Sequence, residues 1–460
     1  MDNFERLQIS CGLDVNFGLS LFNLVETNTY SFMRYNITVS NKISQSMEIA
    51  FIHPSSPQSK GSGATHSATQ IVEGLCTRGH DITVYCTDTE PVGTKFEYDI
   101  EQLDLSNGRF SNFPEQLNAA INQKRMEFGQ YDLVHSYLMR SIPSMGKIGA
   151  TTSASTMVTL NAYGGICPRN DLLFMNDTDC DRAGIGRCVT CTAHESLTRS
   201  KYEGKGVIET SVRAAYRFQD RIRNYRKVRE GRRRVDHISH FHALSNHVKQ
   251  KYRSFGFPED QMSVIPNMVD QTFCMDHRSD FTEPYKLLYV GALRHRKGAD
   301  QLVEFLEQYN TQFDPPVELT VVGAGVAKTH LKRAAASHGV ENNIRIEGHV
   351  PYEKLPALYA EHDLFVYLGR WDEPFGRVFL EALCTGTPVF ATNVGAVAEI
   401  VGEAGYVTDK TDIRELAEEL RLVLNSQTLG QMSDRTTENL FPYEPNQVID
   451  QFDCLYRTLV

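Results

Sequence analysis

Two successive series of short apolar segments alternate with longer amphipathic segments along this chain, and this alternation restricts the fold more than any other feature. Parallel strands need crossover connections, which are usually helices, so the alternation predicts parallel sheets covered by helices on both faces. The predicted strands of the first series are Glu48–His53, Ile82–Cys86, Leu133–His135, Met157–Leu160, His237–Ser239 and Ser263–Ile265. Those of the second are Lys286–Val290, Glu318–Val322, Ile344–Ile346, Leu364–Leu368, Pro388–Ala391 and Tyr406–Val407.

The two series predict an α/β protein with two doubly wound, Rossmann-like domains that face a central cleft. The predicted parts are a first domain over residues 47–270, a linker over 271–285, a second domain over 286–440 and a helical segment over 441–460. Glycines follow several strands of the second series, where ligands bind in open α/β sheets, and we expect them to allow close backbone approach to a ligand. They are Gly291, Gly323, Gly325, Gly348 and Gly369.

Residues 1–46 lack the pattern of the rest. They are polar and rich in Asn and Ser, and their best apolar stretch, Leu19–Val25, is too short for a signal peptide. Two interpretations stay open: an N-terminal extension of unknown role, or a coding start assigned too early, with Met47 as the true first residue.

Composition excludes several classes of protein. The formal net charge is −10, which argues against a nucleic-acid binder that works through overall charge. No run of about 18 apolar residues predicts a membrane span. Ten cysteines in 460 residues are too dilute for a disulfide scaffold and favour a reducing cytosol.

Several motifs carry a family resemblance. The segment Glu373–Glu381, Glu-Pro-Phe-Gly-Arg-Val-Phe-Leu-Glu, resembles the paired-glutamate motif of the retaining glycosyltransferases of family 4, which have the two-domain GT-B architecture. Tyr289–Gly298, Val321–Gly325, Val264–Asn267 and the opening strand with its Gly-Ser-Gly loop and Arg78–His80 are also similar to this family, in the same order. The resemblance covers the chain from Met47 to its end.

The resemblance implies transfer of a sugar from a nucleotide-sugar to an acceptor hydroxyl, with retention at the anomeric carbon. It also implies that the chemistry needs no catalytic metal, and that the helix within 441–460 crosses back to the first domain. The first domain would bind the acceptor and the second the nucleotide-sugar.

Local chemistry also supports an interpretation of the paired glutamates, Glu373 and Glu381. Pro374 suits the first turn of a helix, so Glu373 is expected just ahead of that helix and Glu381 on it. The amides of Gly376, Arg377 and Val378 would then point at a diphosphate bound before the helix. Glu373 would accept hydrogen bonds from sugar hydroxyls, and Glu381 would hold the ribose hydroxyls. The alternative is that both acids are solvated helix-end charges.

Lys297 is the candidate group that neutralises the leaving diphosphate, six residues beyond Gly291. The family has an arginine directly after this glycine, whereas the present chain has Ala292. Arg294 or Arg296 is the candidate substitute phosphate ligand. The alternative for Lys297 is an exposed loop lysine.

The acceptor side is predicted from two loops of the first domain. Gly61 and Gly63 belong to the glycine-rich loop after the first strand, and Asn161 follows a later strand at a position where many family members have a histidine. An asparagine can hydrogen-bond a sugar but cannot carry a proton or a charge, so its role would be limited to positioning. Simple turn chemistry is the alternative for both loops.

Four cysteines follow Asn161, namely Cys167, Cys180, Cys188 and Cys191. The last two are separated by two residues, a spacing that lets two thiolates reach one tetrahedral ion. A structural zinc or other metal is one interpretation, and reduced thiols or a disulfide are the other. Such a site would hold an acceptor-side loop in place.

The basic charge is concentrated in residues 199–234, which contain thirteen basic and four acidic residues. Arg213, Arg217 and Arg221 recur every fourth residue on one helical face, with apolar residues nearby. This pattern predicts docking on anionic lipid at the cytoplasmic face of a membrane, with a lipid-linked glycan precursor as acceptor. A solvated basic face is the alternative for the helix. A soluble acceptor, or a non-catalytic protein that binds nucleotide-sugar, are the alternatives for the function.

Overall fold

The computed structural model describes residues 46–56, 63–88, 97–105, 111–175, 178–201, 207–274, 278–325 and 327–460. Side chains are described in these ranges except at residues 198–210. The predicted N-terminal extension therefore lies outside the described residues apart from Ser46, as does Gly61.

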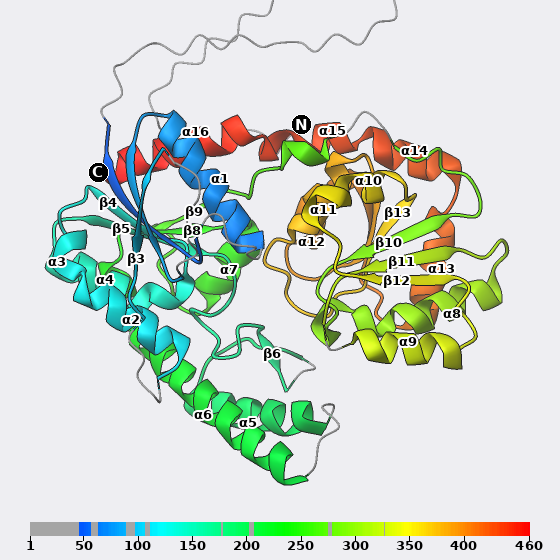
Figure 1. Cartoon of the computed structure of the whole chain (residues 1–460), viewed down its shortest axis with the longest axis horizontal. Helices are drawn as coiled ribbons and strands as arrows, with labels where there is room; N and C mark the ends of the chain where they lie inside the picture. The colour runs from blue at the N-terminus through cyan, green and yellow to red at the C-terminus, as the bar shows by residue number, and fades with distance from the viewer. Residues whose placement is uncertain are drawn as a thin grey trace, which may run out of the picture. The chain divides into compact units, whose positions relative to one another are not determined.

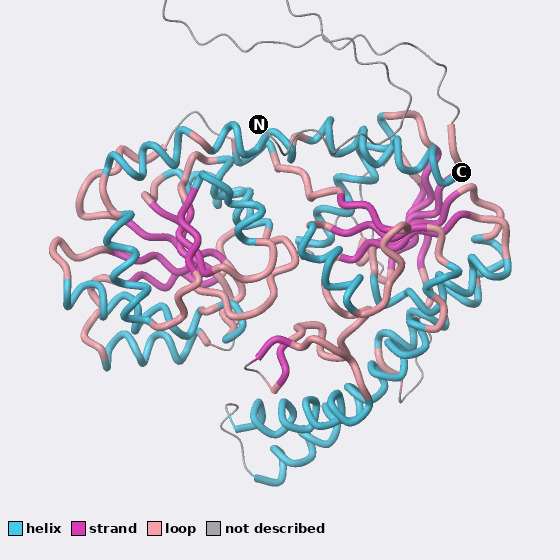
Figure 2. The backbone as a smooth tube through the Cα atoms, turned by 180° about the vertical axis from the view of Figure 1, so that it is seen from behind, coloured by secondary structure: helices cyan, strands magenta, loops and turns pink. Residues whose placement is uncertain are grey.

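The first parallel sheet has seven strands in the order β3-β2-β1-β4-β5-β8-β9 (Figures 1 and 2). Its strands are β1 (Glu48–His53), β2 (Asp81–Cys86), β3 (Asp99–Gln102), β4 (Leu133–Ser136), β5 (Ser155–Leu160), β8 (His240–Ala243) and β9 (Met262–Val264). A separate two-stranded antiparallel ribbon pairs β6 (Leu173–Phe174) with β7 (Thr178–Asp179).

The second parallel sheet has six strands in the order β12-β11-β10-β13-β14-β15. They are β10 (Lys286–Val290), β11 (Glu318–Val322), β12 (Ile344–Gly348), β13 (Leu364–Tyr367), β14 (Val389–Thr392) and β15 (Gly405–Thr408). In both sheets the strand order reverses at the first strand, which is the doubly wound topology.

Helices cover both faces of each sheet (Figure 1). Those before the second sheet are α1 (Gly63–Thr77), α2 (Phe113–Gln123), α3 (Arg125–Phe128), α4 (Ile142–Thr151), α5 (Ile185–Lys201), α6 (Val207–Arg232) and α7 (Asn246–Ser254). Those after β10 are α8 (Leu302–Gln312), α9 (Lys328–Ser337), α10 (Leu355–Ala360), α11 (Arg377–Cys384), α12 (Val397–Val401), α13 (Ile413–Val423), α14 (Ser426–Asp434), α15 (Thr436–Leu440) and α16 (Pro445–Leu459).

Strand β1 shows how the sequence produces this layering. Successive side chains of a strand point to opposite faces of the sheet. Ile49 and Phe51 pack into the core beneath α1, whereas Ala50 and Ile52 pack into the core on the other face. All four are fully buried, which explains why the strand reads as a continuous apolar run.

The C-terminal helix α16 packs on the first sheet, beside α1 (Figure 1). Phe452 and Tyr456 are fully buried there. His80 pairs with Asp453 at 2.6 Å, and the Tyr456 hydroxyl hydrogen-bonds the ring of His135. The last helix therefore joins the core of the first domain although it follows the second.

Two strand predictions needed correction. His237, the predicted start of a strand, lies in a 3₁₀ turn (Val235–His237), and β8 begins three residues later at His240. Strand β3 was not predicted, because its sequence Asp-Ile-Glu-Gln is mostly polar and exposed at the sheet edge. None of the described helices is long and apolar enough to cross a membrane.

Candidate active site

The centre of the second sheet places two predicted site residues on neighbouring loops. Strands β10 and β13 are adjacent and parallel, and the strand order reverses between them. Lys297 lies in the loop after β10 and Glu373 in the loop after β13. Ligands of open α/β sheets bind outside the carboxyl ends of strands at such a reversal.

The backbone of these two loops is in direct contact at Gly298. This residue has a positive φ of 73°, and a Cβ atom built on it would lie 1.7 Å from the carbonyl oxygen of Leu368. Only glycine fits this position, so the residue that follows Lys297 fixes the loop against the end of β13.

Glutamate 373 is buried, with 4% of its surface exposed, and its carboxylate has three donors. The ammonium group of Lys297 pairs with Oε2 of Glu373. The hydroxyl of Tyr367 donates to the same oxygen at 2.6 Å, and the indole N–H of Trp371 donates to it at 3.0 Å. The structure thus brings together the predicted lysine and the first predicted glutamate.

The electrostatics of Glu373 favour the carboxylate. Burial alone would raise its pKa, but the charge of Lys297 and the hydrogen bonds from Lys297, Tyr367 and Trp371 outweigh it and lower the pKa. Lys297 keeps 20% of its side chain exposed. The Lys297 side chain is therefore only partly buried, unlike the carboxylate with which it pairs.

The basic residues near Lys297 separate into two environments. Arg296 is partly buried and stacks on the Trp371 ring, with 4.3 Å from its guanidinium carbon to the ring centroid. Arg294 and Ala292 are exposed. Among the described residues Arg294 makes no ion pair. Both predicted substitute arginines therefore lie at the edge of the site.

The helix that carries the second glutamate begins later than predicted. Pro374 lies in the loop, and α11 starts at Arg377 after Gly376, which has a φ of 80°. Since first-turn amides have no acceptor within the helix, the amides of Arg377 and Val378 are free donors at the α11 N-terminus. The prediction that Pro374 occupies the first turn was wrong, because the left-handed Gly376 sets the helix start.

Glutamate 381 lies on α11 in a different environment. It is 8% exposed, and the hydroxyl of Tyr359 donates to its Oε2 at 3.2 Å. Burial raises the pKa of Glu381, and the charge of Arg377 opposes this only in part. The pKa values of the two predicted glutamates are thus shifted in opposite directions. Glu373 stays ionised, whereas Glu381 accepts a proton more easily than an ordinary glutamate.

The side chain of Arg377 reaches the first domain. Its guanidinium donates to Oγ of Ser67 at 2.7 Å and to Oε1 of Gln70 at 3.1 Å, both on α1. A Cβ atom built on Gly63, at the start of α1, would lie 3.1 Å from Cδ of Arg377. The Arg377 side chain is therefore engaged with α1, and predicted residue Gly63 lies beside it.

The predicted acceptor residue Asn161 follows β5 directly. Its Nδ2 donates to the carbonyl of Tyr137 at 3.1 Å, whereas its Oδ1 is buried and has no hydrogen-bond partner among the described residues. Tyr163, two residues further, packs edge-on against Trp371, with ring centroids 6.4 Å apart. The loop after β5 thus reaches the surroundings of Glu373.

One glycine prediction needs correction. A Cβ atom built on Gly323, at the end of β11, would lie 1.8 Å from the carbonyl oxygen of Gly291. This glycine therefore lets the loops after β10 and β11 pack together. Close approach of a ligand is not needed to explain it.

Comparison with known protein families gives a match over the part of the chain that contains the second sheet. Residues 275–440 match the family model described as Glycosyl transferases group 1. This matched segment is similar to that family and is called the group 1 domain below. The group 1 domain contains β10 to α15, and with them Lys297, Glu373 and Glu381.

Two curated relatives match part of the chain. Glycogen synthase of Mycobacterium tuberculosis is 33% identical over 184 residues, which cover 39% of this chain and 44% of that protein. The GDP-mannose-dependent alpha-(1-6)-phosphatidylinositol monomannoside mannosyltransferase of Mycolicibacterium smegmatis is 30% identical over 187 residues, covering 37% of this chain and 49% of that protein. The chain therefore spans less than half the length of each of these relatives.

A solved structure matches the whole fold. Anabaena Alr3699/HepE in complex with UDP superposes with a TM-score of 0.62 over 90% of this chain and 100% of that chain, at 18% sequence identity. The chain has the GT-B fold, two Rossmann-like domains as predicted. The group 1 domain is the second of these two domains.

The four predicted metal-ligating cysteines do not assemble into a site. Within the described ranges, no group of three or more Cys, His, Asp or Glu side chains could hold a metal ion. The Sγ of Cys191 instead accepts a hydrogen bond from Arg169 at 3.2 Å, and Cys180 faces the carbonyl of Arg182 at 3.4 Å. These sulfurs, with those of Cys167 and Cys188, are free thiols, which was the alternative interpretation.

Another pair of cysteines was missed by sequence reasoning. Cys274, in the predicted linker, forms a disulfide with Cys384 at the end of α11, 110 residues away. No local pattern indicates a pairing over that distance. This disulfide differs from the reducing environment that the cysteine content favoured.

The basic segment forms a helical hairpin in which α5 and α6 lie side by side (Figures 1 and 2). The arginine face expected from the sequence is not uniformly free. Arg221 is partly buried, 3.9 Å from Glu195 of α5 and 4.0 Å from Asp220. Four exposed arginines instead share one face of the last two turns of α6 and its end, without an ion pair to any described residue. They are Arg226, Arg229, Arg232 and Arg233.

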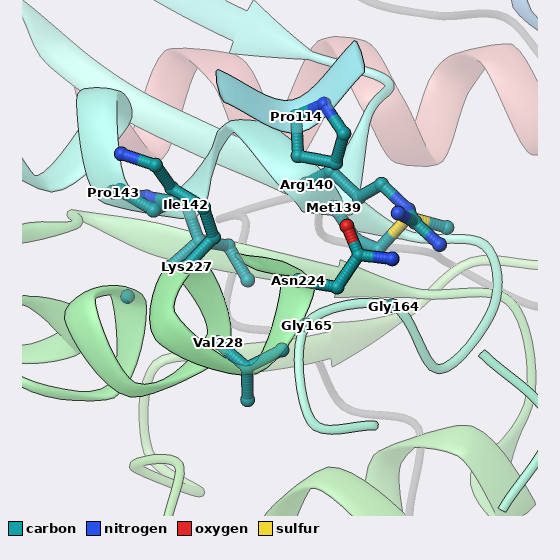
Figure 3. A pocket seen from close by; sticks show the side chains of 11 residues that line it. Pro114, Met139, Arg140, Ile142, Pro143, Gly164, Gly165, Asn224, Lys227 and Val228 are labelled. Atoms are coloured by element: carbon teal, nitrogen blue, oxygen red, sulfur yellow. The ribbon is translucent and has the colours of Figure 1, made fainter. Parts of the chain in front are cut away.

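The later part of α6 is anchored to α2 and to the loop after β5. Figure 3 shows Asn224 and Arg140 beside a small cavity of about 10 Å³, which is about the size of one water molecule. Asn224 donates to the carbonyl of Pro168 at 3.2 Å and accepts from Nδ2 of Asn112 at 2.9 Å. These contacts fix the position of this part of α6.

The pKa of Glu373 gives a testable pH dependence. Trp371 is the single tryptophan of the chain and donates to Glu373, so its fluorescence should report protonation of that carboxylate. Because the pKa of Glu373 is lowered, the ion pair with Lys297 stabilises the fold above the usual glutamate pKa of about 4.3 and is lost only as the pH falls through the lowered pKa. We expect an emission change below pH ~4.3 in the folded protein.

Circular dichroism at each pH separates this change from acid unfolding. The variant Glu373→Gln should lack the transition, because its amide does not titrate. An emission change at or above the usual glutamate pKa would contradict the assignment.

Proposed function

We propose that this chain is a retaining glycosyltransferase that moves a sugar from a nucleotide-sugar to an acceptor hydroxyl. The observation that carries the proposal is the contact of Lys297 with Glu373 at the strand-order reversal of the group 1 domain. The UDP bound by Anabaena Alr3699/HepE, a protein of the same fold, supports a nucleoside diphosphate as part of the donor.

The leaving diphosphate takes the place that Glu373 holds at Lys297. Negative charge accumulates on the leaving group as the glycosidic bond breaks, so a positive group and free amides aimed at it stabilise the transition state. Lys297 supplies the charge, and the amides of Arg377 and Val378 at the start of α11 supply the donors. These groups take over the neutralising role that a divalent metal would otherwise fill.

The two glutamates bind different parts of the donor. Once Lys297 turns to the diphosphate, the ionised Glu373 is left with Tyr367 and Trp371 and accepts hydrogen bonds from sugar hydroxyls. Glu381 holds the ribose hydroxyls. Retention follows from attack by the acceptor on the same face of the sugar as departure, as the family resemblance implies.

The acceptor is a lipid-linked glycan precursor at the cytoplasmic face of a membrane. The α5–α6 hairpin supports this, because it exposes apolar side chains as well as the four arginines of α6. Leu197, Val212 and Tyr216 are 63%, 65% and 74% exposed. Exposed apolar side chains and positive charge on one hairpin are the combination found in helices that bind anionic lipid. Figure 1 shows the hairpin extending beyond the helices that cover the first sheet.

A soluble sugar or sugar-phosphate acceptor is the second candidate, favoured by the similarity to glycogen synthase of Mycobacterium tuberculosis. A non-catalytic nucleotide-sugar binder is the third. A hydrolysis and transfer screen over several nucleotide-sugars, with lipid extract or soluble sugars as acceptors, separates the three functions. Measurable binding without turnover of any donor would favour the non-catalytic protein.

Replacement of Lys297 tests the role of the leaving-group site. Lys297→Met should lower kcat by about 10²–10³-fold, the usual cost of one lost transition-state donor. The matched control is Lys410→Met, which removes an exposed lysine of the same domain and should leave kcat unchanged. Equal rates for the two variants in the donor screen would contradict the assignment.

Replacement of arginines on α6 tests the membrane-docking surface. Arg232→Gln combined with Arg233→Gln should weaken binding to phosphatidylglycerol vesicles about 25-fold, since each basic residue at the surface contributes about 1 kcal/mol. The control pair is Lys354→Gln with Lys410→Gln, both exposed lysines of the second domain. Cosedimentation that is the same for both pairs, or no binding by the unmodified protein, would favour a soluble acceptor.

A further inference from the structure

The residue before Glu373 is held by the first domain. Asp372 is buried, with 6% of its surface exposed, yet its carboxylate belongs to the loop after β13. His247 of α7 approaches Oδ1 at 3.0 Å, and Lys251 of the same helix pairs with Oδ2 at 2.7 Å. Burial would raise the pKa of Asp372, but these two partners lower it, so the carboxylate is ionised.

The residue after Glu373 is held by the same helix. Ser245, which caps α7 by accepting a hydrogen bond from the amide of Val248, donates through its hydroxyl to the carbonyl of Pro374 at 2.8 Å. One serine therefore caps the N-terminus of α7 in the first domain and anchors the glutamate loop of the second. This contact is fully buried on the serine side.

A third contact fixes the backbone of Glu373 itself. The amide of Ala396 donates to the carbonyl of Glu373 at 2.8 Å, just before α12. Glu399 of α12 accepts from both the amide and the side chain of Asn246, each at 3.0 Å. The first turn of α7 thus contacts both segments that support Glu373.

We propose that Ser245, His247 and Lys251 are positioning residues that align Glu373 for the reaction. The inference rests on the proposed function, since it names further residues for the same site. The need for them follows from the chemistry at Lys297. When that lysine turns to the diphosphate, Glu373 loses its charged partner, and contacts within the second domain hold the carboxylate less firmly. The contacts of Asp372 with His247 and Lys251 do not involve the donor and persist.

Because of these contacts, the alignment of Glu373 depends on how α7 of the first domain packs against the glutamate loop of the second. Contacts of α7 with Asp372, Pro374 and Glu399 form only when the first domain meets the glutamate loop. A loop displaced by about 1 Å can lose about 10²-fold in rate, so a modest loosening is enough to be measured. Donor affinity, which depends on Lys297, the α11 amides and Glu381, should change little.

The test replaces Lys251 with methionine in the full chain. Lys251→Met should lower kcat by about 10- to 100-fold while the affinity for nucleoside diphosphate stays within about twofold. Lys251→Arg should recover most of the activity, because arginine also pairs with a carboxylate. The matched control is Arg253→Met on the same helix, whose side chain is 60% exposed and pairs with Glu259 of the first domain.

The emission of Trp371 gives a second readout that does not require turnover. Trp371 precedes Asp372 directly, so Lys251→Met should shift its emission and Arg253→Met should not. Unchanged emission and kcat in Lys251→Met would overturn the proposal, as would a loss of nucleotide affinity that matches the loss of rate. Absence of turnover in the unmodified chain would refute the proposed function, while the emission comparison would still decide whether α7 aligns this loop.

Discussion

The site depends on one electrostatic interaction, the partly buried ion pair between Lys297 and Glu373. The Glu373 carboxylate is buried, so its charge depends on this lysine and on the hydrogen bonds from Tyr367 and Trp371. The pair exists because β10 and β13 are neighbours at the point where the strand order reverses, so the loops that follow them meet. The topology of the sheet therefore selects which two residues, 76 positions apart, can share a charge.

In the proposed function, the same constraint gives the two glutamates of the motif different roles. Glu373 faces Lys297 and stays ionised, whereas Glu381 lies on α11 among weaker donors and its pKa is raised by burial. A group that must remain charged beside a sugar and a group that hydrogen-bonds a ribose make different demands. One short segment meets both demands because Gly376 starts the helix between them.

Most of the fold could be predicted from the sequence. The elements that were not predicted have sequences that lack the usual physical signal. Strands β1, β10 and β13 are buried except at Glu48 and Lys286, and their apolar runs indicated the fold class. The polar edge strand β3 carries no such signal.

For the site, the motifs indicated Lys297 and Glu373. They could not show that α7 and its N-cap contact both sequence neighbours of Glu373, Asp372 and Pro374. Contacts between distant segments have no local pattern. The single tryptophan beside the acidic motif was a signal that could have been used.

The most direct measurement of the central claim is the position of the diphosphate in a crystal structure with a bound nucleoside diphosphate. The account predicts that the terminal phosphate contacts Nζ of Lys297 and the amides of Arg377 and Val378, with the pair between Lys297 and Glu373 broken. A diphosphate bound elsewhere, with that ion pair intact, would contradict it.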